Sequence, residues 1–298
     1  MTTVATPHGG MARPQRATVA IAWIGTLVLS ELPIIVLVET LGGDPAPLRW
    51  LWPVAGATLV ALATRWQPAR PLRGYFGVLL AVIAATYAIT PLLTGWVPAT
   101  GLEVVQALAV KAIFFAVAAT LAALLVLGLH QRRSDVFLTP GNLRAPSSVR
   151  LPGMRRPLRW TVVGTAAAVL LPLGFATQLW MESAFPRAGV ARLPGLALVI
   201  LAAACCNAFA EEFIFRAAPL AYLQPVIGAG QAVLMTSVWF GLGHYLGGIP
   251  PGPLGAVQSG VLGLLLGTAM VETRGLGWPL IIHITIDVVV FASIAAAI

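Results

Sequence analysis

The chain has 298 residues, of which only 9% are charged and 58% are hydrophobic. Its mean hydropathy is +0.89, whereas a soluble domain carries roughly 25% charged residues, so the composition excludes an ordinary soluble protein and indicates a membrane protein. The formal net charge of +8 does not indicate nucleic-acid binding, because the arginines lie in loops between apolar segments and not along one polar face.

Apolar segments follow one another along the chain, and most are long enough to cross a bilayer. A spanning helix needs about 20 mostly apolar residues, and on that criterion we predict spans near 17–41, 50–64, 75–97, 104–129, 159–180, 194–222, 229–246, 254–272 and 278–297. The segment 50–64 is short. The predicted fold is therefore all-α, a polytopic membrane helix bundle with eight or nine transmembrane helices.

Some polar and small residues inside these spans are interpreted as packing features. Glu31 and Glu39 are eight apart, on nearly the same face of the first span, and Lys111 is available to an acid in the N-terminal half. We interpret these three as helix-packing or interfacial groups. Gly263 and Gly267 form a small-xxx-small pair, which favours a close approach of two helices.

The basic residues predict the orientation and the domain organisation. They concentrate before the first span, after the second, and above all between residues 130 and 159. The positive-inside rule then places the N-terminus and that loop in the cytoplasm, and we expect a multi-pass protein of the cell (plasma) membrane. We divide the chain into a polar N-terminal tail at 1–16, N-terminal transmembrane helices at 17–130, a cytoplasmic Arg/Pro-rich loop at 131–158 and a C-terminal transmembrane region at 159–298.

The C-terminal region contains the sequence EEFIFR at residues 211–216. Ionisable groups in a membrane cost roughly 2.5–3.5 kcal/mol each on insertion scales, and they indicate function by default. Glu212 and Arg216 are four apart on a helix, so they share a face and can neutralise each other. Glu211 points about 100° away from Glu212 and lacks that partner.

Two further motifs place histidines in the same region. FGLGH sets His244 one turn after Phe240, and HITID sets His283 and Asp287 on one face of a helix. A free carboxylate and two imidazoles are what the activation of water requires, since the carboxylate takes the proton and an imidazole orients the water or stabilises the oxyanion. Each motif alone is equally compatible with structural hydrogen bonding. All three together point to catalysis.

The ordered set EExxxR, FxxxH and HxxxN/D resembles the CPBP family of intramembrane proteases, which are of the CAAX-processing (type II) and bacteriocin-processing, Abi-like kind. The stretch from Gly263 to His283 is also similar to this family, and the resemblance covers roughly residues 194–297. It implies an intramembrane endopeptidase of the CAAX prenyl protease-like type, which hydrolyses a peptide bond of a membrane-associated protein or peptide by glutamate-activated water.

The resemblance also implies roles for the motif residues. Glu211 would be the general base, His244 and His283 would hold the water or polarise the scissile carbonyl, and Glu212 and Arg216 would fix the helix. Asp287 departs from the Asn often found at this position. An ionised Asp cannot donate a hydrogen bond to an oxyanion as Asn can, so Asp287 either orients His283 or is protonated in a buried site.

Several alternatives stay open at the level of sequence. We favour a reaction without metal, although the glutamate, the two histidines and the aspartate are also plausible zinc ligands. A non-catalytic immunity or scaffold protein of the same family, which binds peptides in the same cavity, is the first alternative function. A proton-coupled transporter that uses Glu211 and the histidines as a relay is the second.

Helix lengths place Glu211 and His244 at a similar depth. Each lies about 15 residues from the turn near 224–230, which at 1.5 Å per residue is roughly 20–25 Å. His283 fits less well if residues 254–272 cross the membrane completely. Either the GGIPPGP loop at 247–253 dips into the membrane, or the following helix is tilted or broken.

Overall fold

The computed structural model describes residues 16–42, 48–99, 103–150, 156–182 and 187–297. Within these ranges the chain is helical, with no strand beyond an isolated bridge between Pro146 and Arg159. The predicted all-α bundle is thereby confirmed. Except for Arg16, the predicted N-terminal tail lies outside the described residues, as do parts of the predicted loops near 42–48, 98–103 and 131–158.

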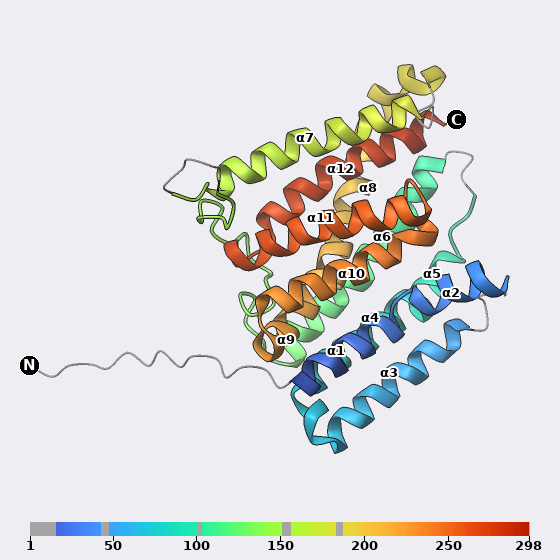
Figure 1. Cartoon of the computed structure of the whole chain (residues 1–298). Helices are drawn as coiled ribbons and strands as arrows, with labels where there is room; N and C mark the ends of the chain where they lie inside the picture. The colour runs from blue at the N-terminus through green and yellow to red at the C-terminus, as the bar shows by residue number, and fades with distance from the viewer. Residues whose placement is uncertain (1–15, 43–47, 100–102, 151–155, 183–186, 298) are drawn as a thin grey trace, which may run out of the picture.

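The N-terminal half forms a series of helices that ends before a long loop. They are α1 (Arg16–Leu29), α2 (Leu32–Leu41), α3 (Leu48–Arg65), η1 (Gln67–Leu72), α4 (Arg73–Ile83), η2 (Ala84–Ile89), α5 (Thr90–Thr94), α6 (Glu103–Ala123) and η3 (Leu124–Gly128). Figure 1 shows α1, α3 and α4 together on one side of the bundle.

The C-terminal half contains longer helices that pack mainly against one another. They are α7 (Trp160–Met181), η4 (Arg187–Arg192), α8 (Leu193–Glu212), η5 (Phe213–Ala217), α9 (Ala218–Ile227), α10 (Ala229–Gly247), α11 (Gly252–Thr273) and α12 (Gly277–Ala296). α10 packs along α11, α8 lies between α6 and α12, and α7 covers α12 (Figure 1).

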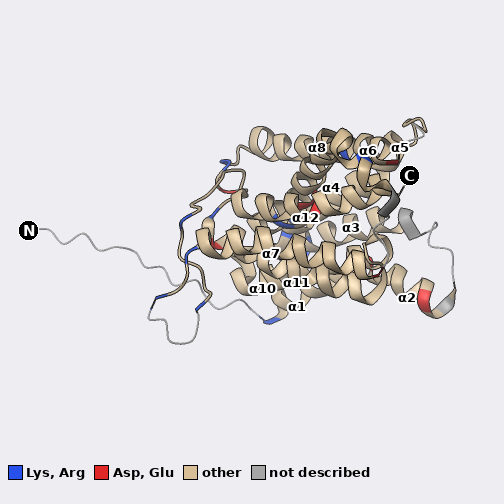
Figure 2. Ribbon diagram, turned by 90° about the horizontal axis from the view of Figure 1, so that it is seen from above, with Lys and Arg blue, Asp and Glu red and all other residues tan. Residues whose placement is uncertain are grey.

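Six helical runs are long and apolar enough to cross a membrane by length and composition, or seven if the bent pair α1–α2 is one span; this count covers the described residues only. It is smaller than eight or nine, because the apolar helix over 50–64 is shorter and α10 is not among the qualifying helices. α10 carries Gln231, Thr236, Ser237 and His244 among its 19 residues. Figure 2 shows few charged residues on the helices and basic residues gathered in the loops at one end of the bundle.

The first predicted span is bent and not straight. α1 and α2 meet at 52°, around Ser30, whose Oγ donates to the Leu27 carbonyl at 2.8 Å and accepts the Leu32 N–H at 3.1 Å. Pro33 lies in the first turn of α2, where its ring cannot continue the preceding hydrogen-bond ladder. The bend precedes Glu31, whose carbonyl accepts the Ile35 N–H of α2 at 2.9 Å, so Glu31 as N-cap and Glu39 both belong to α2.

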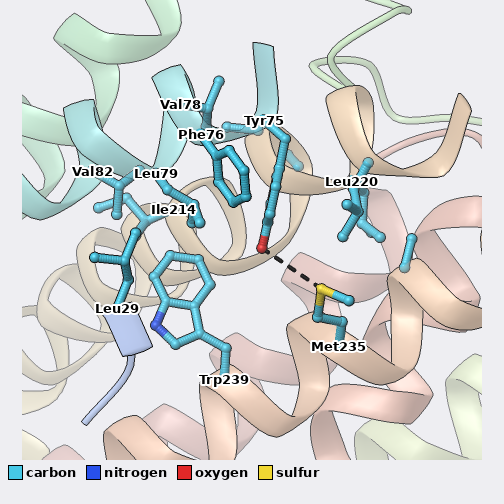
Figure 3. Close-up of a cluster of buried hydrophobic side chains, with 14 of the residues drawn as sticks. Leu29, Tyr75, Phe76, Val78, Leu79, Val82, Ile214, Leu220, Met235 and Trp239 are labelled. Atoms are coloured by element: carbon cyan, nitrogen blue, oxygen red, sulfur yellow. Dashed lines mark hydrogen bonds between the residues drawn. The ribbon is translucent and has the colours of Figure 1, made fainter. Parts of the chain in front are cut away.

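A buried cluster fastens the N-terminal helices to α10 (Figure 3). Tyr75 of α4 donates to Sδ of Met235 on α10 at 3.9 Å, and its Oη lies 2.6 Å from Oγ1 of Thr26 on α1. Trp239 of α10 packs in the same cluster. The buried hydroxyl groups thus find partners across three helices, and the helix that carries His244 is held in place.

α10 and α11 approach closely at glycines. A Cβ added to Gly241 would lie 2.6 Å from the Ala256 carbonyl oxygen, and one added to Gly263 would lie 3.0 Å from Cα of Ser237. Gly267 faces Val233 in the same way. Gly263 and Gly267 therefore act as the close-packing pair predicted from their spacing.

The loop before α7 is fastened to the turn between α11 and α12. The Asn142 N–H donates to the Thr273 carbonyl at 2.7 Å, and the indole N–H of Trp160 donates to Glu272 Oε2 at 2.7 Å. The indole N–H of Trp278 donates to the Leu143 carbonyl at 2.9 Å. These bonds fix the beginning of α12, the helix that carries His283.

Candidate active site

Glu211 and Glu212 end α8, and the π-helical turn η5 follows them directly. Such turns occur often at functional sites. Arg216 lies in this turn and donates from Nη1 to Glu212 Oε1 at 2.5 Å, with both side chains fully buried. Its guanidinium carbon also lies 4.0 Å from the centre of the Phe240 ring. The geometry is that predicted for a neutralising Glu212–Arg216 pair.

His283 of α12 contacts three carboxylates. Its Nδ1 lies 2.7 Å from Glu212 Oε1, and Nδ1 is the donor because a carboxylate only accepts. Its Nε2 lies 3.6 Å from Glu211 Oε2 and 3.6 Å from Asp287 Oδ1. Glu212 therefore orients the ring, and the opposite nitrogen faces Glu211.

His244 of α10 approaches Glu211 from another side. Its Nε2 lies 3.8 Å from Glu211 Oε2, and its Nδ1 donates to the Phe240 carbonyl at 2.8 Å. This bond lies within the same helix and leaves Nε2 directed at the carboxylate. The side chain of His244 is 25% exposed, against 4% for His283, so His244 is the more accessible imidazole.

Glu211 thus lies between two imidazoles and is 9% exposed. Within the described residues no hydrogen bond reaches its Oε2. α11 is continuous over Gly252–Thr273, and Gly247, Gly248 and Ile249 at the end of α10 line the same cavity as Glu211. The α10–α11 loop therefore lies beside the site, and α11 is not broken.

Asn207 is a polar residue of the site that the motifs did not indicate. Its Nδ2 donates to Asp287 Oδ2 at 2.9 Å, and only 6% of its surface is exposed. Asn207 precedes Glu211 by four residues on α8, so the two share a helix face. That spacing was the signal available in the sequence.

These residues line a cavity of about 650 Å³. The acidic and imidazole groups of the lining come from α8, α10 and α12. Apolar side chains come mainly from α7, α11 and α12, with Leu170, Phe175, Val257, Val261, Leu265 and Val290 among them. Lys111 of α6 also lines this cavity, which corrects the expectation that it serves the N-terminal half.

The side chains do not form a metal site as they are placed. In the parts of the chain that the structure describes, no group of three or more His, Cys, Asp or Glu side chains is arranged to hold a metal ion.

Comparison with known proteins agrees with the geometry. The family model of the Rce1-like type II CAAX prenyl endopeptidases matches residues 193–289. Residues 193–289 are a domain of this family. The Rce1-like domain contains Glu211, Glu212, Arg216, His244, His283 and Asp287, and it confirms the resemblance seen in the motifs. No curated protein and no solved structure matches the chain.

The apolar helices indicate a multi-pass membrane protein, in which residues 193–289 match a CAAX-type protease family. The domain begins with α8 and ends within α12. Lys111 on α6 and the apolar lining residues of α7 lie outside it.

Proposed function

We propose that the protein is an intramembrane endopeptidase in which Glu211 activates water. The observation that carries this proposal is the position of the Glu211 carboxylate, which faces a cavity between His244 and His283 at 3.8 and 3.6 Å. A base must lie within reach of the proton that it abstracts, directly or through one water. An acid between two imidazoles, in a largely apolar cavity, provides that arrangement.

The reaction follows from these positions. Glu211 takes a proton from water, the water oxygen bonds to the carbonyl carbon of the scissile peptide, and the electron pair of the C=O bond moves onto oxygen. Because Nδ1 of each ring donates, Nε2 of His244 and of His283 accepts a hydrogen bond from the water while the ring is neutral, and it donates to the developing oxyanion when the ring is protonated. When the intermediate collapses, the C–N bond breaks and the amine leaving group takes the proton from Glu211.

Glu212 and Arg216 position this machinery without contacting the substrate. Arg216 balances the charge of Glu212, and Glu212 holds Nδ1 of His283 at 2.7 Å. Asp287 lies 3.6 Å from Nε2 of the same ring. The hydrogen bond to Glu212 therefore orients the ring of His283, and Asp287 lies near its other nitrogen.

The substrate is a membrane-associated protein or peptide, and no nucleic acid is involved. The cavity supports this, because apolar side chains line it together with the catalytic groups and accept apolar side chains of a substrate. We place the protein in the plasma membrane, surrounded by the lipid bilayer. The basic residues at the loop end of the bundle (Figure 2) support a cytoplasmic N-terminus and a cytoplasmic 131–158 loop.

The test compares newly formed protein N-termini in membranes of cells that express the full chain or its Glu211→Gln variant. We expect a set of termini that appears with the wild type and is absent with Glu211→Gln. Glu103, which is exposed at the start of α6, supplies the matched control, since Glu103→Gln makes the same chemical change away from the cavity. Termini that persist in the folded Glu211→Gln variant would sink the mechanism.

A further inference from the structure

α8 and α12 face each other with two polar pairs, one turn apart. Glu211 lies opposite His283 at 3.6 Å, and Asn207 lies opposite Asp287 at 2.9 Å. Both pairs follow from four-residue spacings on the two helices. All four side chains line the same cavity, so the amide of Asn207 lies one helical turn from the proposed base.

The reaction needs a hydrogen-bond donor for the carbonyl oxygen as negative charge develops on it. Asp287 does not supply one when ionised, because a carboxylate only accepts. Its acceptor role is visible in the structure, where Oδ2 receives the Nδ2–H of Asn207. Of these two facing side chains, the amide on α8 is the donor that the structure shows.

The amide of Asn207 has hydrogen-bonding groups that its contacts with the protein do not use. A primary amide has two N–H donors and one acceptor oxygen, and one of these N–H groups goes to Asp287. The Oδ1 atom is buried and has no hydrogen-bond partner among the described residues. A buried polar atom without a partner is costly, which argues against a purely structural role for Asn207, and the residue lines the cavity.

We propose that Asn207 is a further catalytic residue, whose second Nδ2–H donates to the oxygen of the scissile carbonyl. Asp287 positions that amide by accepting its first N–H. This proposal rests on the proposed function. It assigns the carbonyl oxygen to α8, which leaves Nε2 of His244 and of His283 to hold the attacking water.

The chemical step is the hydrolysis described above, with one bond added. As the C=O electron pair moves onto oxygen, the hydrogen bond from Asn207 strengthens and no proton is transferred through it. Loss of one such donor lowers kcat about 10²- to 10³-fold in a comparable oxyanion site. Binding of the ground-state peptide depends on it much less.

The test uses the Glu211-dependent termini as readout, measured as their initial rate of appearance after expression of the full chain. Asn207→Leu keeps the branched shape of the side chain and removes both of its polar atoms. We expect the initial rate at which the termini appear to fall at least 100-fold. The double variant Asn207→Leu/Asp287→Asn carries an amide on α12 in place of the one lost from α8. We expect its rate to be at least 10-fold higher than that of Asn207→Leu. With a peptide synthesised around one such terminus, purified variants should show the loss in kcat and not in KM.

The outcomes separate the two proposals. If no termini depend on Glu211, the proposed function itself fails. If they do, and Asn207→Leu retains wild-type turnover, Asn207 is not catalytic. If Asn207→Leu is inactive and Asp287→Asn restores nothing, Asn207 only holds Asp287 in place and the donor assignment is wrong. Melting of each purified variant excludes misfolding as the cause, and Asn207→Ala replaces Asn207→Leu if the leucine does not fit.

Discussion

Arg216 offers a direct test of the charge balance behind the active site. The change Arg216→Met keeps an unbranched apolar side chain but removes the guanidinium, which donates to Glu212 at 2.5 Å and lies 4.0 Å from the centre of the Phe240 ring. Both members of the ion pair are fully buried, so solvent does not screen the loss. The substitution leaves Glu212 with the hydrogen bond from His283, among the residues that the structure describes.

Breaking one partner of a buried ion pair costs about 3–5 kcal/mol, and the desolvated cation–π contact contributes about 2 kcal/mol within the same change. We therefore expect Arg216→Met to lower the free energy of unfolding by about 3–5 kcal/mol, since these contributions overlap. Reversible unfolding of the purified full chain in mixed micelles, followed by circular dichroism, measures it. Arg144→Met, at an exposed loop arginine, serves as control and should stay within about 0.5 kcal/mol of wild type.

A second variant separates charge from packing. Glu212→Gln/Arg216→Met removes both charges, and replacing a whole buried pair is often nearly neutral. We expect the double variant to regain at least half of the stability that Arg216→Met loses. A loss below about 1 kcal/mol in the single variant, or no recovery in the double variant, would refute the view that Arg216 is there to balance Glu212.

Two further predictions follow from the geometry. His244→Leu and His283→Leu should each lower kcat about 10²- to 10⁴-fold. Only His283→Leu should also lower the melting temperature, because His283 is hydrogen-bonded to Glu212, whereas His244 bonds to a carbonyl of its own helix. Equal melting temperatures of the two variants would contradict the positioning role of Glu212. Gly241→Ala should lower the free energy of unfolding by about 1–3 kcal/mol, since its Cβ would lie 2.6 Å from a carbonyl oxygen of α11. The control is Gly230→Ala, whose Cβ would meet nothing within 4 Å, and it should change the free energy of unfolding by less than about 1 kcal/mol. Unfolding in mixed micelles measures the glycine pair, and equal effects at both positions would argue against close helix packing.

Most of what could be predicted about the site came from the spacing of residues within single helices. Glu212 and Arg216 are four apart, and that spacing survives the π-helical turn between them. The four-residue spacing also brought His283 and Asp287 to one face. Such pairs are visible in a sequence because both partners belong to one helix, whose geometry is fixed by its backbone.

Contacts between helices could not be derived in the same way. The bond from His283 to Glu212 joins residues 71 apart, and it depends on where α11 places α12. The motifs did not indicate Asn207, because its hydrogen-bond partner, Asp287, lies on another helix. Lys111 reaches the cavity from α6 by the same kind of packing, which no spacing along the chain encodes.

The bend in the first span shows a different limit. A hydropathy pattern averages over a window and reads residues 17–41 as one apolar segment. Ser30 and Pro33 break it, because a proline cannot join the hydrogen-bond ladder of the preceding turn. Both residues were visible in the sequence, but a proline is also tolerated in a transmembrane helix that stays straight enough to count as one span.

The lining of the cavity comes from residues inside and outside the Rce1-like domain. The acid and imidazole groups all lie within residues 193–289, whereas Leu170, Leu171 and Phe175 belong to α7, outside that domain. A substitution on α7 would therefore alter which side chains fit the cavity without touching any contact of Glu211. Under the proposed function, α7 is thus a helix outside the domain from which the range of accepted peptides can be changed.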